Sequence, residues 1–183
     1  MTDQTTLETE RLILRRFNLK DAPRVQLLAG DKAIAETTLN IPHPYEDGMA
    51  EEWIGTHEDQ RNAGKLENFA IVQKEDNNLV GAIGLVIKRE FESAEMGYWV
   101  GKPYWGKGYC TEAARAVLKY GFEQLELNRI HAHYMVSNSA SAKVMEKIGM
   151  QYEGHLRQAI KKWGKFHDYK AYSILKSEYV QKS

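Results

Sequence analysis

The chain has 183 residues, of which 43% are hydrophobic and 27% are charged, and its 25 Lys and Arg balance its 25 Asp and Glu. This length predicts a single domain over residues 1–183, large enough for a sizeable hydrophobic core. The zero net charge disfavours nucleic-acid binding as the main task, because contact with phosphates normally requires an excess of cations.

The sequence carries no sign of export, membrane insertion or a disulfide. No apolar run approaches the roughly 20 residues of a membrane-spanning helix, and the start MTDQTTLETERLILRRF lacks the parts of a signal peptide. Cys110 is the single cysteine and cannot form an internal disulfide. We therefore predict a soluble cytoplasmic protein without direct contact with membranes or nucleic acid.

Apolar periodicity in the first half predicts one strand, two helices and a hairpin. Leu12 and Leu14 alternate as in a half-buried strand, and Asn18 then offers an oxygen to the free amides of a helix start. The expected elements are a strand near 12–17, a helix near 21–28, a helix over 49–63 and a hairpin from 68 to 87 around a turn at 75–78.

The second half continues with a strand, a helix, a strand, a helix and two further strands. Their expected ranges are 95–100, about 109–125, 129–136, 139–148, 150–160 and 165–175. The complete order has seven strands and four helices without a linker or a repeat. It predicts a mixed α/β domain.

The stretch WVGKPYWGKGYCTEAA at 99–114 carries the clearest chemical signal, because a strand, a glycine-bearing turn and a helix start follow one another. Free amides and the positive end of the helix dipole form an anion site there, so we expect a phosphate-bearing ligand. A P-loop would need Ser or Thr where Gly108 stands, and a dinucleotide fingerprint would need Gly where Thr111 stands. A helix-capping loop without a ligand is the alternative.

With its neighbours, this segment resembles the GNAT superfamily of acetyl-CoA-dependent N-acetyltransferases, in particular the ribosomal-protein N-terminal (alanine/serine) acetyltransferase branch. The matching stretches are ETERLILR at 8–15, GYWVGKPYWGKGYCTEA at 97–113, NSASAKVMEKIGM at 138–150 and GKFHDYKAYSIL at 164–175. The pyrophosphate motif of the family, Gln/Arg-x-x-Gly-x-Gly/Ala, falls on Trp105, Gly108 and Cys110, where Gly108 alone keeps the family residue.

The resemblance implies the GNAT fold, a twisted and mostly antiparallel sheet of about seven strands, splayed in the middle and flanked by about four helices. It also implies acetyl-CoA as co-substrate, with backbone amides near 105–110 around the pyrophosphate and an amide of Trp99 or Val100 polarising the thioester carbonyl. The implied cofactor-binding residues are Trp99, Val100, Trp105, Gly106, Lys107, Gly108, Tyr109, Cys110, Thr111, Asn138 and Ser141.

Asn138 is an ordinary helix N-cap by local sequence, whereas the resemblance implies contact with the pantetheine arm of CoA. The family often places a Tyr seven residues later as the acid that protonates the departing thiolate, and here Met145 stands there. A thioether has no proton to give. We therefore expect the hydroxyl of Ser141, or water, to donate a hydrogen bond to the sulfur.

The acceptor amine must be neutral to attack a thioester, and preparing a Lys costs roughly 3 kcal/mol more than preparing an α-amine. Alternation on the strand before the phosphate loop places Glu95 on one face with Gly97 and Trp99, next to the splay. We assign Glu95 as the general base, directly or through water. A structural ion pair is the alternative for Glu95, and Glu67 is the alternative base.

Other residues receive mainly structural interpretations. His131 and His133 share a strand face, but no third ligand follows at a recognisable interval, so no metal site is expected. Cys110 reads as a packing residue, and Asp168 as an anchor for the acceptor ammonium or a tie within a strand turn. A cluster of cations in the last third of the chain predicts a solvated hairpin face, or alternatively a site for the CoA 3′-phosphate or for an acidic partner. Its members are Arg157, Lys161, Lys162, Lys165 and Lys170.

The sequence therefore predicts an enzyme that transfers acetyl from acetyl-CoA to a primary amine by direct attack in a ternary complex. By resemblance, the acceptor is the N-terminus of a protein such as a ribosomal protein, and the acceptor-binding segments are Ile34 to Met49 and Trp163 to Tyr169. Two alternatives stay open, an acetyltransferase for a small amine such as a polyamine or an aminoglycoside, and a non-catalytic acyl-CoA sensor. A homodimer is also left open.

Overall fold

A computed structural model describes residues 5–180 of the chain. Its centre is one sheet in the order β1-β2-β3-β4-β5-β6-β8-β7, in which every neighbouring pair is antiparallel except β5 with β6. The strands are β1 (Leu7–Glu8), β2 (Leu12–Arg15), β3 (Leu66–Gln73), β4 (Leu79–Lys88), β5 (Ser93–Val100), β6 (Arg129–Met135), β7 (Gln151–Lys162) and β8 (Lys165–Leu175).

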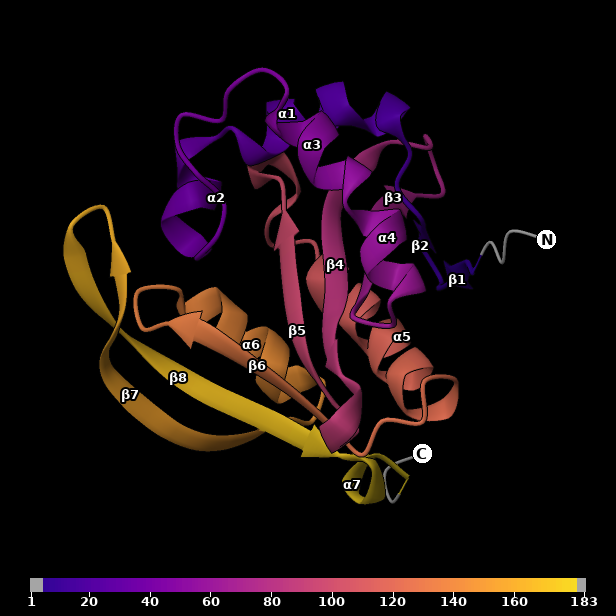
Figure 1. Cartoon of the computed structure of the whole chain (residues 1–183), viewed down its shortest axis with the longest axis vertical. Coiled ribbons are helices and arrows are strands. Elements are labelled where there is room, and N and C mark those ends of the chain that lie inside the picture. The colour runs from indigo at the N-terminus through magenta and orange to yellow at the C-terminus, as the bar shows by residue number, and fades with distance from the viewer. Residues whose placement is uncertain (1–4, 181–183) are drawn as a thin grey trace.

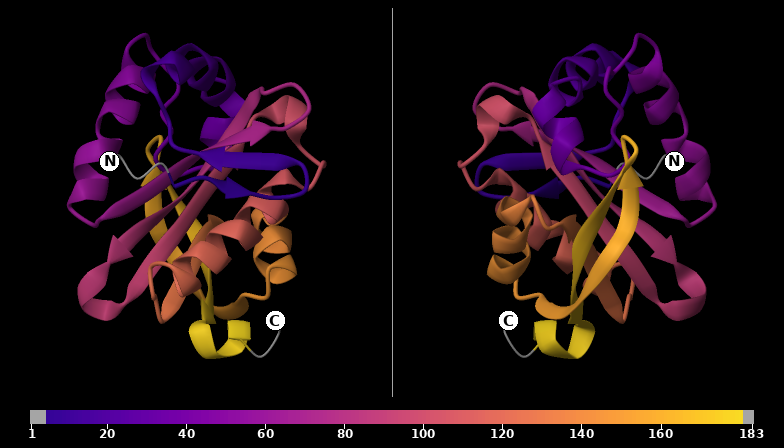
Figure 2. Two further views of the ribbon diagram at one scale, coloured as in Figure 1. Left: turned by 90° about the vertical axis from the view of Figure 1, so that its right-hand side faces the viewer. Right: turned by 90° about the vertical axis from the view of Figure 1, so that its left-hand side faces the viewer.

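Helices cover both faces of this sheet. They are α1 (Ala22–Ala29), α2 (Lys32–Thr37), α3 (Met49–Gly55), α4 (His57–Asn62), α5 (Tyr109–Glu123), α6 (Ser139–Lys147) and α7 (Lys176–Val180). Figure 2 shows α5 and α6 on one side of the sheet and the helices of the first half on the other. None of the helices within residues 5–180 is long and apolar enough to cross a membrane.

The expectation of about seven strands and four helices missed four features of the described chain, one of which is helix α7 after β8. Strand β1 pairs only Leu7 with Leu14 and Glu8 with Ile13, which is too short to show alternation. Helix α2 has six residues and is capped by Asp31, whose side chain accepts from the amide of Ala33. The helix predicted over 49–63 divides at Thr56, whose hydroxyl donates to the carbonyl of Trp53.

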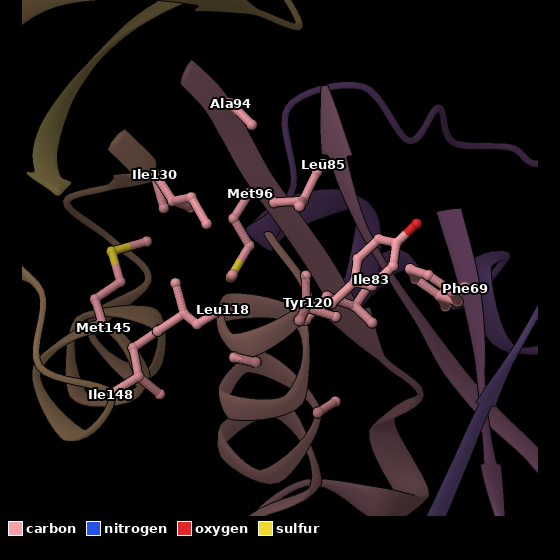
Figure 3. Close-up of a cluster of buried hydrophobic side chains, with 14 of the residues drawn as sticks. Phe69, Ile83, Leu85, Ala94, Met96, Leu118, Tyr120, Ile130, Met145 and Ile148 are labelled. Atoms are coloured by element: carbon pink, nitrogen blue, oxygen red, sulfur yellow. The ribbon is translucent and has the colours of Figure 1, made fainter. Parts of the chain in front are cut away.

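The main core lies between the sheet and helices α5 and α6. Apolar side chains of β3, β4, β5 and β6 meet those of the two helices, and Figure 3 shows Leu85, Met96 and Ile130 facing Leu118 of α5. A Cβ at Gly121 of α5 would lie 2.6 Å from Cδ1 of Ile130, so any larger residue there would displace the Ile130 side chain. This packing fixes the start of α5 relative to β5 and β6.

Strands β5 and β6 separate after a short parallel contact. Their register joins Ser93, Ala94 and Glu95 to Arg129, Ile130 and His131, and the pairing ends there. Beyond it, β5 continues beside β4 whereas β6 continues beside β8, which opens a V between the two halves of the sheet (Figure 1). The splay expected from the sequence is therefore present, and it begins at Glu95.

Candidate active site

The loop from β5 into α5 presents backbone amides without an internal partner. Gly106 and Gly108 have φ values of 75° and 81°, in the left-handed region that glycine adopts without strain. Trp105 donates its amide to Lys102 and Glu112 donates its amide to Gly108, but no protein acceptor is found for the amides of 106–111 within residues 5–180. A helix start of this form offers its amides to an anion.

A side-chain clamp holds this loop against the turn between β1 and β2. Nε of Arg11 donates to Oε2 of Glu112 at 2.7 Å, and the hydroxyl of Thr9 donates to Oε1 of Glu112 at 2.6 Å. Arg11 also donates to the carbonyl of Lys107 at 3.0 Å. Partial burial opposes ionisation of Glu112, but the hydrogen bonds from Thr9 and Arg11 lower its pKa below the ordinary value. The loop is therefore held in place before any ligand arrives.

Trp105 and Cys110 of the loop have structural roles, and the contacts behind these roles are visible only in the fold. The indole of Trp105 donates to the carbonyl of Val100 at 2.6 Å and ties the loop to the end of β5. Burial raises the pKa of the Cys110 thiol to about 12, so this thiol stays protonated and is a poor nucleophile. The interpretation of Cys110 as a packing residue agrees with this environment.

A cavity of about 680 Å³ lies where β5 and β6 separate. One wall is formed by β5 and β6, including Glu95, Trp99 and His133, and another by residues 37–42 after α2. Two segments were expected to bind the acceptor. Residues 34–49 supply much of this second wall. From the segment Trp163 to Tyr169, which lies within the described residues, only Tyr169 lines the cavity.

Glu95 lies at the base of the V beside two imidazoles. Nδ1 of His133 lies 3.2 Å from Oε1 of Glu95, and the rings of His131 and His133 meet edge to face at a centroid distance of 5.3 Å. The hydrogen bond with His133 lowers the pKa of Glu95 against the opposing effect of burial. Burial lowers the pKa of His131 despite the nearby Glu95 carboxylate. This arrangement places an ionised carboxylate within the cavity.

The alternative base points elsewhere. Leu66 and Asn68 of β3 line the cavity, and alternation along the strand therefore turns Glu67 toward the opposite face. Glu95 lines the cavity directly. The geometry thus favours Glu95 over Glu67 as the carboxylate closest to an acceptor.

Asn138 adopts the N-cap role that its local sequence indicates. Its Oδ1 accepts from the amide of Ser141 at 3.3 Å, while its Nδ2 donates to the hydroxyl of Ser141 at 3.0 Å and to the carbonyl of Thr37 at 3.1 Å. Asn138 therefore connects α6 to the end of α2. The hydroxyl of Ser141 keeps its own proton available for a ligand in the cavity that it lines.

Tyr98 brings a second hydroxyl to this site, and the sequence analysis assigned it no specific role. Its hydroxyl donates to the carbonyl of Ser141 at 3.2 Å, and burial raises its pKa above the ordinary value. Met145 lies beside it in the cavity wall and is 1% exposed. No sequence motif distinguishes this tyrosine from its aromatic neighbours, so the contact with α6 could be found only in the fold.

The hairpin of β7 and β8 departs from the expected solvated cationic face at Lys162. This residue is 8% exposed, and its ammonium donates to the carbonyls of Ala35 and Thr38 at the end of α2. Elsewhere in the hairpin, Asp168 accepts from Nε2 of His155 and from the amide of Gln158, each at 2.7 Å. This use of both carboxylate oxygens favours the structural interpretation of Asp168.

Comparison with known proteins identifies the class to which this fold and site belong. Residues 11–151 match the family described as "Acetyltransferase (GNAT) domain". The "Uncharacterized N-acetyltransferase p20" of Bacillus licheniformis is 36% identical over 177 residues, which cover 96% of this chain and 98% of that protein. The chain belongs to the GNAT family and is an N-acetyltransferase, as the sequence resemblance indicated.

Two further relatives bear on the expected branch and ligands. YdaF of Bacillus subtilis (strain 168), which is named as a candidate ribosomal N-acetyltransferase, is 30% identical over 178 residues, covering 93% of this chain and 94% of YdaF. The crystal structure of spermidine N-acetyltransferase from Vibrio cholerae, in complex with CoA and spermine, has a TM-score of 0.80 and 26% identity, covering 92% of this chain and 98% of that one. The family and the fold are thereby confirmed.

Proposed function

We propose that this enzyme transfers the acetyl group of acetyl-CoA to the N-terminal α-amine of a protein, such as a ribosomal protein, in a ternary complex. The observation that carries this proposal is the position of Glu95 at the point where β5 and β6 separate, beside a cavity of about 680 Å³. The relationship to YdaF supports a ribosomal acceptor.

The start of α5 is the proposed site of the CoA pyrophosphate. The unpaired amides of 106–111 and the left-handed glycines fit a phosphate that approaches the backbone closely. Ser141 lines the cavity, and Asn138 caps the helix that carries Ser141; these two residues are the proposed contacts of the pantetheine arm. The complex of the Vibrio cholerae relative with CoA supports the same class of co-substrate.

Glu95 is the proposed general base. The entering ammonium loses a proton to the Glu95 carboxylate, directly or through water, and the neutral amine attacks the thioester carbon. His133 orients the carboxylate through their 3.2 Å contact. A backbone amide of Trp99 or Val100 is the proposed donor to the carbonyl oxygen as negative charge develops.

The attack forms the carbon–nitrogen bond, and collapse of the adduct then breaks the carbon–sulfur bond and leaves its electron pair on sulfur. The nitrogen of the adduct passes its second proton through water to the thiolate, and Glu95 returns the first proton to solvent. The hydroxyl of Ser141 is the proposed hydrogen-bond donor to that thiolate, which finally takes up a proton as free CoA. The raised pKa of the Cys110 thiol supports direct transfer over an acetylated-cysteine route. The ammonium and acetyl-CoA thereby give the N-acetyl product, free CoA and one proton that is released to solvent.

An α-amine fits this site better than a Lys side chain on energetic grounds. An α-amine has a pKa of about 7.7–8.0, whereas a Lys side chain has a pKa of about 10.4. Deprotonating the α-amine therefore costs less free energy, which suits a base such as Glu95 whose own pKa is lowered. The cavity carries few acidic side chains, with Glu52 and Glu95 as its lining carboxylates among the described residues. A polyamine would favour a more acidic wall.

The test of the base compares Glu95→Gln with the matched control Glu67→Gln over a range of pH. We expect Glu95→Gln to lower kcat by about 100-fold, most strongly at low pH where the amine is protonated, while Glu67→Gln stays close to the parent. Turnover is followed with acetyl-CoA and a panel of α-amino peptides, polyamines and aminoglycosides. A pH–rate curve of Glu95→Gln that matches the parent would reject Glu95, and preference for a polyamine would reject the acceptor.

A further inference from the structure

The cluster of Glu95, His131 and His133 combines residues that are far apart in the sequence. The parallel register sets Glu95 opposite His131, and His133 follows two residues later on the same face of β6. Each side chain offers one potential ligand atom, and these atoms all lie within 4.8 Å of one another. Strand β5 thus supplies the third ligand that the spacing on β6 alone does not show.

We propose that Glu95, His131 and His133 form a binding site for a divalent transition-metal ion, with Zn²⁺ as the best chemical match. Two imidazoles and one carboxylate are a common three-ligand set for zinc with one open position. Bonds of about 2.0–2.2 Å in a tetrahedral site bring ligand atoms to about 3.4 Å from each other. Glu95 and His133 already stand at 3.2 Å, so the main adjustment falls on His131.

His131 is free to make that adjustment. Its Nδ1 is buried and has no hydrogen-bond partner among residues 5–180, so no bond fixes the orientation of the ring. Buried polar atoms without partners are rare in folded proteins, and a bound ion is one of the arrangements that satisfies such a ring. The absence of a fixed outer partner for His131 predicts an affinity about 10-fold to 100-fold below that of a zinc site with such a partner.

Metal binding would have a consequence for acetyl transfer, and this part rests on the proposed function. An ion on Glu95 engages the carboxylate oxygens that the incoming ammonium needs, and an ion on His133 removes the contact that orients the carboxylate. Glu95 can then either accept the proton of the ammonium or, together with His131 and His133, bind the metal ion. Zn²⁺ is therefore a reversible inhibitor of this enzyme.

Binding is measured by calorimetric titration of Zn²⁺ into the chelator-treated full chain. We expect one equivalent to bind, and His131→Gln to weaken that binding by about tenfold or more, which corresponds to about 1.4 kcal/mol. His155→Gln removes an imidazole from the β7–β8 hairpin and serves as the control, with unchanged affinity. Absence of binding, or equal binding by His131→Gln, would overturn the site.

Two additional readouts keep the result clear if a variant folds poorly or activity is absent. Co²⁺ added to the unmodified protein should give the visible absorption of a tetrahedral nitrogen–oxygen site, and a spectrum equal to that of aqueous Co²⁺ contradicts the proposal. Zn²⁺ should also slow acetyl-CoA consumption by the parent more than by His131→Gln. Binding without inhibition overturns the link to the base, whereas inactivity toward every amine overturns only the proposed function.

Discussion

The proposed phosphate loop and the proposed acceptor cavity are built in opposite ways. The loop over residues 101–111 offers backbone amides from one short stretch. It is held by the hydrogen bonds of Arg11 and Thr9 with Glu112 and by the indole of Trp105. The cavity is assembled from side chains of β3, β5, β6, α6 and the segment after α2. A site built from backbone amides tolerates changes of side chain. A site built from side chains of distant segments depends on their packing. Variants in the two regions should therefore fail in different ways.

The largest effect is expected for Gly108→Val in the loop. A β-branched residue at φ 81° is strained, and its Cβ would lie 3.5 Å from the guanidinium of Arg11, so the amides would turn away from a phosphate. We expect acetyl-CoA affinity, measured calorimetrically, to fall by about 100-fold, or about 2.7 kcal/mol. Gly154→Val is the control, because a Cβ there meets no atom within 4 Å. Equal affinity of Gly108→Val and the parent would show that phosphate binding does not depend on this backbone.

The stability of the fold should depend on pH through His57, which packs on Trp53 of the cavity wall. His57 packs edge to face on Trp53, and burial lowers its pKa to about 4 from 6.5. Between pH 6.5 and pH 4 the unfolded chain binds more protons at His57 than the folded chain does. The contribution of neutral His57 to the free energy of unfolding is therefore complete above pH 6.5 and is lost as the pH falls toward 4. We expect about 2 kcal/mol less stability at pH 5 than at pH 7.5 from this group. Urea unfolding of His57→Gln should lack that part of the pH dependence, and an unchanged slope would contradict the assignment.

Ser141→Ala tests the junction of the two regions. Removing the hydroxyl takes away a hydrogen-bond donor near the proposed sulfur position while the amide of Ser141 stays bonded to Asn138. We expect release of CoA from the ternary complex to slow by about tenfold, with a smaller change in acetyl-CoA affinity. Single-turnover kinetics separate the two quantities. If the rate stays equal, solvent protonates the thiolate.

The smallest effect is expected for Lys162→Met. The buried ammonium binds carbonyls at the end of α2, next to the cavity wall formed by residues 37–42. We expect the acceptor KM to rise by about threefold to fivefold, with acetyl-CoA affinity unchanged, because loss of a charged hydrogen bond loosens that wall. Lys161→Met is the control, since Lys161 instead lies over the ring of Phe166. A fall in acetyl-CoA affinity would show that the two regions are coupled.

The sequence predicted the loop region well because its determinants are local. Gly108, the helix from Tyr109 and the N-cap at Asn138 are each specified within a few residues, and the family resemblance and the enzyme class are confirmed. Element ranges agree closely for the hairpin of β3 and β4. The roles of the site residues, the single domain over 1–183 and the homodimer stay predictions.

The acceptor region could not be predicted to the same depth because it depends on strand order. The contact of Glu95 with His133 exists because β5 and β6 are parallel neighbours, and apolar alternation is silent on that order. Lys162 and Ala35, which are hydrogen-bonded in the fold, are 127 positions apart in the sequence. From the sequence alone, a cation in a hairpin is predicted to be solvated. These contacts are products of tertiary packing, which local patterns do not encode.

The separation of β5 from β6 also leaves the molecule with an incomplete ladder. Past Glu95 and His131, the inward edges of the two strands face each other without register partners among the described residues. The pantetheine arm of CoA contains two amide groups and can lie along such an edge as an added strand does. We expect amide hydrogens on these edges to exchange with deuterium rapidly in the free enzyme and slowly once the co-substrate binds. Slower exchange in the complex would show that the pantetheine arm completes the hydrogen-bonding ladder between β5 and β6.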